Sequence, residues 1–152
     1  MSHPSLGSSY DAAESSPGLL LWRVTNRWQA AQRAALKPHG LTHVQFVLLA
    51  SLAWLGDEAG AVTQKQLADH AATDPMMTSQ VLRVLEQRGF VVRRAHPGDG
   101  RAKALVVTAE GAALAGRAVR AVEATDREFF AVLGSDQSQF AAALVRLTGP
   151  GP

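Results

Sequence analysis

The sequence predicts a mainly α-helical fold with one small β-hairpin. Between residues 63 and 108 the apolar pattern changes in a fixed order. A short amphipathic helix comes first, then a longer one, and then two β-branched runs separated by a turn rich in Gly and Pro. Apolar residues on both sides of this stretch recur at the three- and four-residue steps of helices. With 152 residues the chain is long enough for one domain with a substantial core.

The longer helix of the central stretch is predicted to run from Asp74 to Gly89. Asp74 is a favourable N-cap, Pro75 fits the first helical position, and Gly89 suits a C-cap. The face expected to be buried carries Met77, Val81, Val84 and Leu85, with Leu82 at its edge. The opposite face carries Met76, Ser79, Gln80, Arg83 and Gln87. An ordinary solvated helix has such a face too, but Arg pairs with guanine and Gln with adenine in the major groove.

The helix before it makes DNA recognition the better interpretation. Thr63 and Gln66 form a T-x-x-Q capping box, which predicts a helix from Gln64 to about Ala72. A short helix, a tight turn and a longer helix with a polar outer face form the helix-turn-helix pattern.

The two runs after Gly89 predict the hairpin, or wing, of a winged helix-turn-helix. Residues 90–94 and 101–107 are the expected strands, and 95–100 has the composition of a turn. The hairpin is expected to bring together four cations, Arg93, Arg94, Arg101 and Lys103. Such a cluster repels itself unless phosphates are near, although a solvated basic hairpin is the alternative.

These motifs resemble the MarR family of bacterial transcriptional regulators. The resemblance is carried by Gln-Leu-Ala at 66–68, Leu-Glu-Gln-Arg-Gly-Phe-Val at 85–91, Asp-Gly-Arg-Ala-Lys at 99–103 and Leu-Val-Val-Thr-Ala-Glu-Gly at 105–111. In element order it covers about residues 18–148. It implies that Arg101 enters the minor groove and that Asp99 holds it by an ion pair. The opening of the longer helix, Asp-Pro-Met-Met, departs from the small hydroxyl residues of many relatives and leaves the base preference open.

Together, the polar face of the longer helix and the resemblance to the MarR family imply a set of contacts to double-stranded DNA. The predicted DNA-binding residues are Thr63, Lys65, Met76, Thr78, Ser79, Gln80, Arg83, Arg94, Asp99, Arg101 and Lys103. The charge distribution agrees, because block 83–103 holds six Lys or Arg against two acidic residues while the whole chain has a net charge of only +2.

Helices outside the central stretch are expected to pair two copies of the chain. Four helices are predicted, over 18–37, 43–55, 109–133 and 137–147, with a Thr42–Gln45 capping box before the second and Thr108 and Asp136 as the N-caps of the third and fourth. A loop is expected over 56–60, followed by a brief strand at 61–62 that could pair with the hairpin. We therefore divide the chain into an N-terminal arm (1–17), a winged helix-turn-helix domain (41–108) and dimerisation helices (18–40 and 109–152). A two-fold homodimer would place two recognition helices on a pseudo-palindromic operator.

The remaining observations restrict other functions. No motif for catalysis, phosphate binding or a metal is found, and the His39 and His43 spacing is a weak metal signal because Pro38 and Gly40 place His39 in a loop. The chain has no cysteine, which excludes disulfides and thiol sensing. No apolar run approaches membrane-spanning length and no signal-peptide pattern begins the chain, so a cytoplasmic protein without a cofactor is expected.

The resemblance also implies a ligand. The family often binds small aromatic or phenolic effectors in a cleft between the dimer helices and the winged domain. Trp22, Trp28, His39, His43 and Phe46 are the candidates for that cleft, although each could be an ordinary core or dimer residue. We thus predict a dimeric, sequence-specific repressor released by an effector. The alternatives are a sequence-neutral architectural DNA-binding protein and a winged-helix module that binds other proteins.

Overall fold

The computed structural model describes residues 5–149 and confirms a mainly helical chain with one two-stranded antiparallel hairpin. Its elements, with η for a 3-10 helix, are η1 (Ala13–Ser15), α1 (Pro17–Leu36), η2 (Lys37–His39), α2 (His43–Ala59), α3 (Gln64–Ala71), α4 (Pro75–Gln87), β1 (Val91–His96), β2 (Asp99–Val107), α5 (Ala109–Phe130), η3 (Ala131–Asp136) and α6 (Gln137–Leu147). Residues 1–4 of the predicted arm and 150–152 of the predicted dimerisation segment lie outside the described residues.

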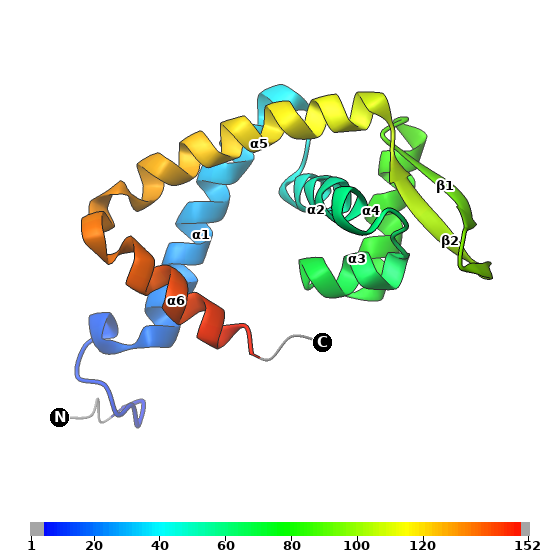
Figure 1. Cartoon of the computed structure of the whole chain (residues 1–152). Coiled ribbons are helices and arrows are strands. Elements are labelled where there is room, and N and C mark those ends of the chain that lie inside the picture. The colour runs from blue at the N-terminus through cyan, green and yellow to red at the C-terminus, as the bar shows by residue number, and fades with distance from the viewer. Residues whose placement is uncertain (1–4, 150–152) are drawn as a thin grey trace.

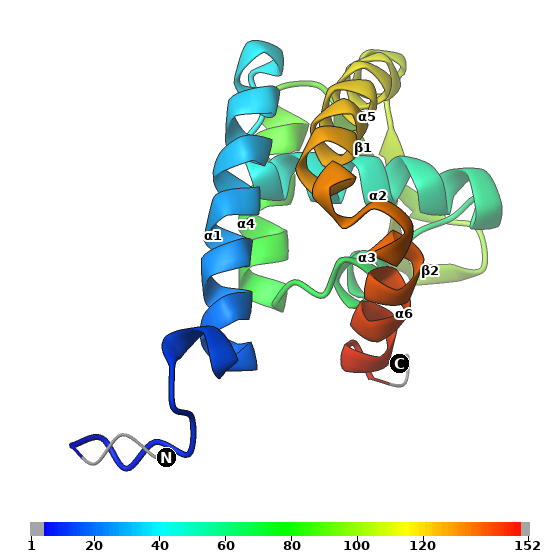
Figure 2. The ribbon, with the colours of Figure 1, turned by 90° about the vertical axis from the view of Figure 1, so that its left-hand side faces the viewer.

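The elements form a winged helical group at one end and an elongated arm at the other. Helix α5 crosses the top of the molecule from the hairpin to the start of α6, which turns back beneath it (Figure 1). Viewed from the arm, α1 lies alongside α5 and extends below it on one side, and α6 descends on the other side (Figure 2). The long α5 therefore belongs to both parts, and it connects the hairpin directly to the arm.

The hydrophobic core lies within the winged group and centres on α2. Helix α2 packs against α1, α3, α4, α5 and β2. The fully or almost fully buried apolar residues include Leu36, Leu48, Leu49, Leu52, Val62, Leu67, Leu82, Leu85, Val91, Leu105 and Ala118. Burying one leucine side chain contributes about 1.5–3 kcal/mol. No residue of α6 is buried, so the core ends where the arm begins.

The predicted caps account for most of the helix starts. The Thr42–Gln45 and Thr63–Gln66 boxes are both formed, and Thr108 accepts from the backbone N–H of Gly111 at 3.1 Å. The prediction that Asp136 caps the last helix is wrong. Its side chain makes no capping hydrogen bond, because η3 leads into α6 with Asp136 already in helical conformation.

Helix α2 is longer than predicted. We expected a loop over 56–60, but α2 continues to Ala59 and ends at Gly60, whose φ is +78°. Gly56 is accommodated inside the helix, and the positive φ at which the helix stops falls on the second glycine, which has no Cβ to oppose it.

The hairpin has a tighter turn than predicted. Its register runs from Val91 opposite Val107 to Ala95 opposite Lys103, and His96 pairs with Asp99 after an irregularity. Val62 pairs with Leu105 through a single bridge, with Leu105 N–H donating to Val62 O at 2.7 Å. The short predicted strand at 61–62 is thus confirmed as one rung that fastens the hairpin to the helices.

Candidate nucleic-acid interface

Helix α4 presents a different inner face from the one predicted. Thr78, Leu82 and Leu85 are fully buried and Val81 is half-buried, whereas Met77 is 43% exposed and Val84 is 36% exposed. Spacings of three and four residues put the buried four on one stripe. The prediction assigned the face by hydrophobicity alone and was wrong, because the apolar Met77 and Val84 lie outside the buried stripe and the polar Thr78 lies inside it.

Thr78 is therefore removed from the predicted DNA contacts. Its side chain has no exposed surface and its hydroxyl donates to the carbonyl of Asp74 at 2.8 Å. The same hydroxyl lies 2.7 Å from the hydroxyl of Thr73. A threonine satisfied in this way packs like valine, and it holds the turn between α3 and α4.

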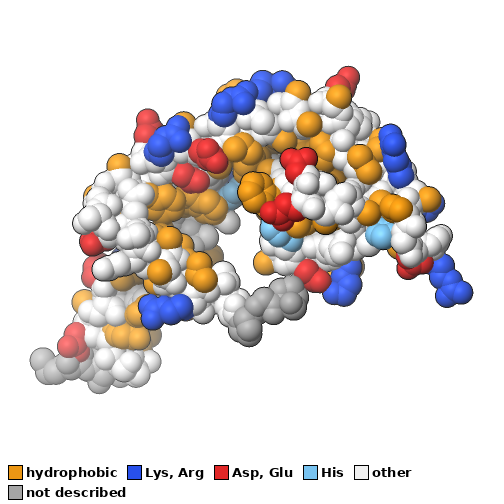
Figure 3. Space-filling view, viewed as in Figure 1, with side chains coloured by type: hydrophobic (Ala, Val, Ile, Leu, Met, Phe, Trp, Pro, Cys, Tyr) orange, Lys and Arg blue, Asp and Glu red, His pale blue; other side chains and the backbone are white. Residues whose placement is uncertain are grey.

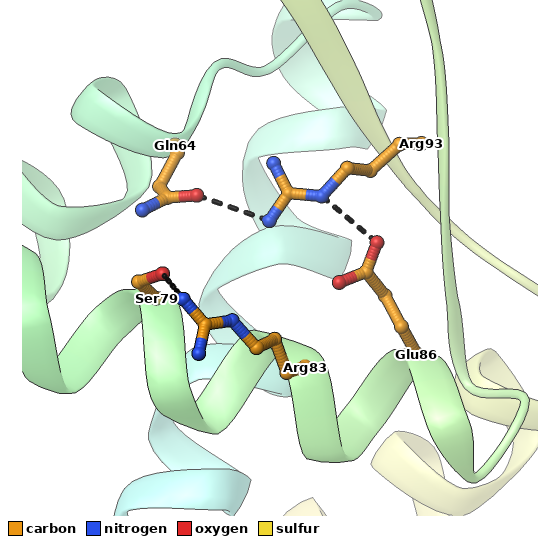
Figure 4. Close-up of polar contacts among 5 residues, drawn as sticks. All are labelled: Gln64, Ser79, Arg83, Glu86 and Arg93. Atoms are coloured by element: carbon orange, nitrogen blue, oxygen red, sulfur yellow. Dashed lines mark hydrogen bonds and ion pairs between the residues drawn. The ribbon is translucent and has the colours of Figure 1, made fainter.

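The outer face of α4 is polar and accessible. Met76 is 72% exposed, Gln80 and Arg83 are exposed, and Ser79 is half-buried. The Arg83 guanidinium turns back along the helix, where Nη2 donates to Ser79 Oγ at 3.4 Å (Figure 4). This long hydrogen bond on an exposed surface leaves the guanidinium available for a base edge.

The two predicted contacts on α3 already have intramolecular partners. Thr63 Oγ1 accepts the capping hydrogen bond from the N–H of Gln66 at 3.2 Å. Lys65 Nζ forms an ion pair with Asp69 at 2.7 Å, one turn along the same helix. Both partners of that pair keep exposed surface, and such surface pairs contribute little stability, so Lys65 can exchange Asp69 for a phosphate.

Arg94, Asp99, Arg101 and Lys103 all lie exposed on the hairpin. The resemblance implied an ion pair between Asp99 and Arg101. Instead, Asp99 Oδ1 accepts a hydrogen bond from the backbone N–H of Arg101 at 3.0 Å, and the structure records no ion pair between the two side chains. Asp99 thus shapes the turn rather than holding the guanidinium.

Arg93 is the hairpin cation that the prediction placed wrongly. We expected it to join the exposed cluster, but its guanidinium points to the helices (Figure 4). Nε donates to Glu86 Oε1 at 2.8 Å and Nη2 donates to Gln64 Oε1 at 3.0 Å. Neighbouring residues of a strand face opposite sides, which separates Arg93 from Arg94.

Arg88 is a structural residue that sequence reasoning did not assign. Its Nη1 donates to Gly40 O at 2.8 Å and to Gln45 Oε1 at 3.3 Å, and its guanidinium lies 5.0 Å from the centre of the Phe90 ring. It thereby ties the end of the recognition helix to the connection between α1 and α2. The only sequence signal was its place in the basic block, which does not distinguish a tie from a DNA contact.

The five predicted effector residues lie on α1, η2 and α2. The rings of Trp28 and His43 meet edge to face with centroids 5.1 Å apart, and Phe46 is buried in the core. Trp22 is 68% exposed on the first half of α1, and His39 lies in η2. Among the five, the structure therefore records a ring contact between Trp28 and His43.

Asp126 completes a polar cluster beside this ring pair. One carboxylate oxygen accepts from Trp28 Nε1 at 2.8 Å and from Gln32 Nε2 at 2.6 Å, which ties α1 to α5. Gln32 is fully buried, and its Oε1 has no hydrogen-bond partner among the described residues. Burial lowers the pKa of His43, the nearby positive charge of Arg33 lowers it further, and Asp126 opposes both.

A groove of about 600 Å³ opens on the winged group, between α2, β2 and the first half of α5. Its walls include small residues, such as Ala50 and Ala53 on α2 and Ala112 and Gly116 on α5. Trp54, which is 62% exposed, lies at this groove. None of the five predicted effector residues lines it.

Arg120 supplies a cation to the same groove. A Cβ built at Gly116 would lie 3.7 Å from Nη1 of Arg120, so the guanidinium lies over the small residues of α5. Within residues 5–149, no group of three or more His, Cys, Asp or Glu is placed to hold a metal ion, and no helix is long and apolar enough to cross a membrane.

A short helix, a recognition helix with an accessible polar face and a basic hairpin define a winged helix-turn-helix DNA-binding protein. Comparison with known proteins specifies the family: the model of the MarR family matches residues 41–103. The HTH-type transcriptional regulator YdcH of Bacillus subtilis is 42% identical over 124 residues, covering 82% of this chain and 84% of that protein. The chain belongs to the MarR family.

Two further relatives have solved structures. The HTH-type transcriptional repressor Rv2887 of Mycobacterium tuberculosis is 38% identical and covers 84% of this chain and 89% of its own length. Its complex with salicylic acid has a TM-score of 0.65. CouR of Rhodococcus jostii RHA1 bound to p-coumaroyl-CoA has a TM-score of 0.82 at 29% identity, covering 94% of this chain and 99% of its own. CouR has also been solved bound to a 23-mer DNA duplex.

Proposed function

We propose that the protein is a homodimeric, sequence-specific transcriptional repressor. The observation that carries this proposal is the exposed face of α4, with Gln80 and Arg83, on the same body as the exposed hairpin cations Arg94, Arg101 and Lys103. In the proposed complex α4 lies in the major groove and the hairpin reaches the adjacent minor groove. The duplex bound by CouR and the repressor activity in the name of Rv2887 support this assignment.

The exposed apolar surface of the arm supports the dimer. On α1, Leu21 and Trp22 are 54% and 68% exposed, and at the other end Val132, Val145 and Leu147 are 90%, 69% and 76% exposed. Figure 3 shows hydrophobic side chains gathered on the arm as well as basic ones along the upper and right-hand edges. A surface of this kind is typical of an obligate interface. The dimer would block polymerase by occupying a pseudo-palindromic operator.

The groove beside α5 is the proposed site of a small-molecule effector. Its volume of about 600 Å³ falls in the range of small-molecule sites. Arg120 would attract an anionic group, and the complexes of Rv2887 with salicylic acid and of CouR with p-coumaroyl-CoA support an acidic aromatic ligand. Because Leu105 and Val107 line the groove, an occupant would contact the base of the hairpin and shift its position. We place this regulator in the cytoplasm and assign it no enzymatic activity.

Fluorescence anisotropy tests the DNA assignment. The protein is titrated at about 150 mM salt against its own upstream DNA and against a scrambled duplex of equal length. A preference of about 10³ or more identifies a sequence-specific regulator. Equal binding that falls steeply with salt identifies the architectural alternative instead. Equal, weak binding that random-sequence selection does not improve favours the protein-interaction module.

Replacing Arg83 by Ala gives the residue-level prediction. If Arg83 pairs with a guanine, the change weakens operator binding by about 1–3 kcal/mol and relaxes the preference at one base pair. Replacing Lys103 by Ala is the matched control, because loss of a phosphate contact weakens all sequences alike and reduces the salt dependence by about one ion. An R83A protein that keeps the full base preference of the parent removes Arg83 from the interface.

A further inference from the structure

Arg93 is the point where the hairpin is fastened to both helices of the helix-turn-helix. The Arg93 guanidinium lies between Gln64 at the start of α3 and Glu86 in the last turn of α4 (Figure 4). The distances are 3.0 Å to Gln64 Oε1 and 2.8 Å to Glu86 Oε1. Only 32% of the Arg93 side chain and 25% of the Glu86 side chain is exposed. A charge-assisted contact with this burial is stronger than an open surface ion pair.

Among the described residues, no other side chain ties the hairpin to the helices further out than Arg93. Toward the tip, the hydrogen bonds are internal: Gly98 N–H donates to His96 Nδ1 and Arg101 N–H to Asp99 Oδ1. Across the part of the chain that the structure describes, no hydrogen bond or ion pair joins residues 94–101 to the helices. The outer hairpin is therefore a lever whose last fastenings, at one level of the register, are the Arg93 side chain and the backbone rung from Leu105 to Val62.

A small change of angle at Arg93 produces a larger displacement at the hairpin tip. Arg93 pairs with Leu105 in the register, and Arg101 lies four residues beyond Leu105. At about 3.3 Å per residue the lever is about 13 Å long. A tilt of about 10° at Arg93 would then move Arg101 by about 2 Å, which is enough to break a hydrogen bond.

The charges also separate Arg93 from the cations that bind DNA. Glu86 neutralises Arg93, while within residues 5–149 the structure records no ion pair for Arg94, Arg101 or Lys103. We propose that Arg93 is a positioning residue that sets the angle of the wing against the recognition helix through Glu86 and Gln64, and that it is not a phosphate contact. This inference rests on the proposed DNA-binding function.

Four changes to the protein distinguish a positioning residue from a phosphate contact: Arg93→Lys, Arg93→Ala, Glu86→Ala and an exchange of Arg93 with Glu86. Arg93→Lys keeps the charge, but an ammonium group cannot span both acceptors as the planar guanidinium does. We expect operator affinity to fall about ten-fold, on the scale of one charged hydrogen bond. Arg117→Lys, at an exposed position of α5 outside the proposed interface, is the matched control for the same substitution, and it should bind as the parent does.

For Glu86→Ala, the direction of the change in operator affinity distinguishes the two roles of Arg93. Removing a carboxylate from a DNA-binding surface strengthens binding if charge alone matters, but weakens it if Glu86 holds Arg93 in place. We expect weaker binding, with Glu123→Ala on α5 as the control for net charge. The exchanged pair Arg93→Glu with Glu86→Arg should recover operator affinity to within about three-fold of the parent, because the ion pair is restored in reverse.

A measurement without DNA keeps this inference separate from the proposed function. The chain has no cysteine, so spin labels can be placed at Gln87→Cys on α4 and Gly98→Cys at the hairpin tip. Labelled protein is diluted with unlabelled protein to suppress distances between subunits. Arg93→Lys should broaden or shift the tip-to-helix distance, and thermal unfolding identifies any variant that has lost its fold.

The outcomes that overturn the proposal are specific. An unchanged distance distribution in Arg93→Lys contradicts positioning, whatever the DNA results. Tighter binding by Glu86→Ala, together with a salt dependence lowered by about one ion in Arg93→Ala, identifies a phosphate contact instead. Absence of operator preference in the parent protein overturns the proposed function, while the distance measurement still decides the role of Arg93.

Discussion

Thr78 and Arg93 show how a single residue's role depends on the direction of its side chain. Both were placed on the DNA side by residue type, and both turn toward the protein. Thr78 is buried because the Asp74 carbonyl and the Thr73 hydroxyl satisfy its hydroxyl. Arg93 turns inward because a carboxylate and an amide oxygen lie within its reach. In each case a polar group follows its available partners rather than the solvent.

Thr78→Val tests the structural role of the buried hydroxyl. Valine has nearly the same shape, so the change removes two hydrogen bonds and leaves the Thr73 hydroxyl without that partner. We expect unfolding free energy to fall by about 1–2 kcal/mol. Chemical denaturation measures the loss, and operator affinity measured well below the unfolding midpoint should stay near the parent value. A large loss of affinity in a fully folded T78V protein would restore Thr78 as a DNA contact.

His43 gives the protein a pH dependence of known sign. Burial and Arg33 lower its pKa in the folded protein below the ordinary value of 6.5. The unfolded chain therefore takes up a proton first as the pH falls, so stability present above about pH 6.5 is lost as the pH drops through the lowered pKa. His43→Gln should flatten this loss in unfolding scans between pH 7.5 and 5. His70→Gln, at an exposed position of α3, is the control, and equal slopes in parent and H43Q would refute the assignment.

At the scale of elements, Gly111 allows the start of α5 to pack closely against the hairpin. A Cβ at Gly111 would lie only 2.2 Å from the carbonyl oxygen of Phe90 and 2.9 Å from Val107 Cγ1. The Phe90 carbonyl also accepts from the Thr108 N–H at 3.0 Å, and the Thr108 hydroxyl donates to Gly89 O at 2.7 Å. Only glycine permits this approach, so the helix that leads into the arm is fixed rigidly to the wing.

Gly111→Ala should separate these two elements. The methyl group meets backbone rather than a movable side chain, so we expect a loss of about 1–3 kcal/mol in unfolding free energy. Gly116→Ala, one and a half turns further along α5, is the control. A Cβ at Gly116 would meet only Nη1 of Arg120, at 3.7 Å, which is ordinary contact. Replacing a glycine by alanine inside a helix stabilises the helix by about 1 kcal/mol. Opposite signs for the two variants in thermal unfolding would confirm the contact, and equal signs would contradict it.

At the scale of the whole molecule, the chain divides its apolar surface between a core and an uncovered arm. The winged group buries its leucines around α2, while α6 buries none and the first half of α1 leaves Leu21 and Trp22 exposed. Asp126 joins α1 to α5 through Trp28 and Gln32, so the arm is braced within one chain. A second copy is the occupant that would remove the remaining surface from water.

Val145→Asp tests the arm as the dimer interface. Burying an unpaired carboxylate in an apolar contact is costly, so sedimentation should show a shift from dimer to monomer. Operator affinity should fall with it, because each subunit then binds one half-site. Ala113→Asp, an exposed position in the winged part of α5, introduces the same charge and should remain dimeric. A V145D protein that sediments as the parent dimer would place the interface elsewhere.

The sequence by itself determined the elements, their order and the class of protein. Capping boxes, helical periodicity and turn residues act over about four residues, so Thr42, Thr63 and Thr108 marked helix starts that the structure confirms. The basic block after the recognition helix added the indication of a nucleic-acid partner. These signals are local, and local signals can be read from one chain.

Only the tertiary structure decided which partner each polar side chain takes and where a groove opens. Arg93 meets Gln64 across 29 positions, Arg88 meets Gly40 across 48, and Trp28 meets Asp126 across 98. The groove forms because small residues on α2 and α5, more than 50 positions apart, face each other below Arg120. No local pattern records such distances, since the packing of whole helices around the core brings these residues together.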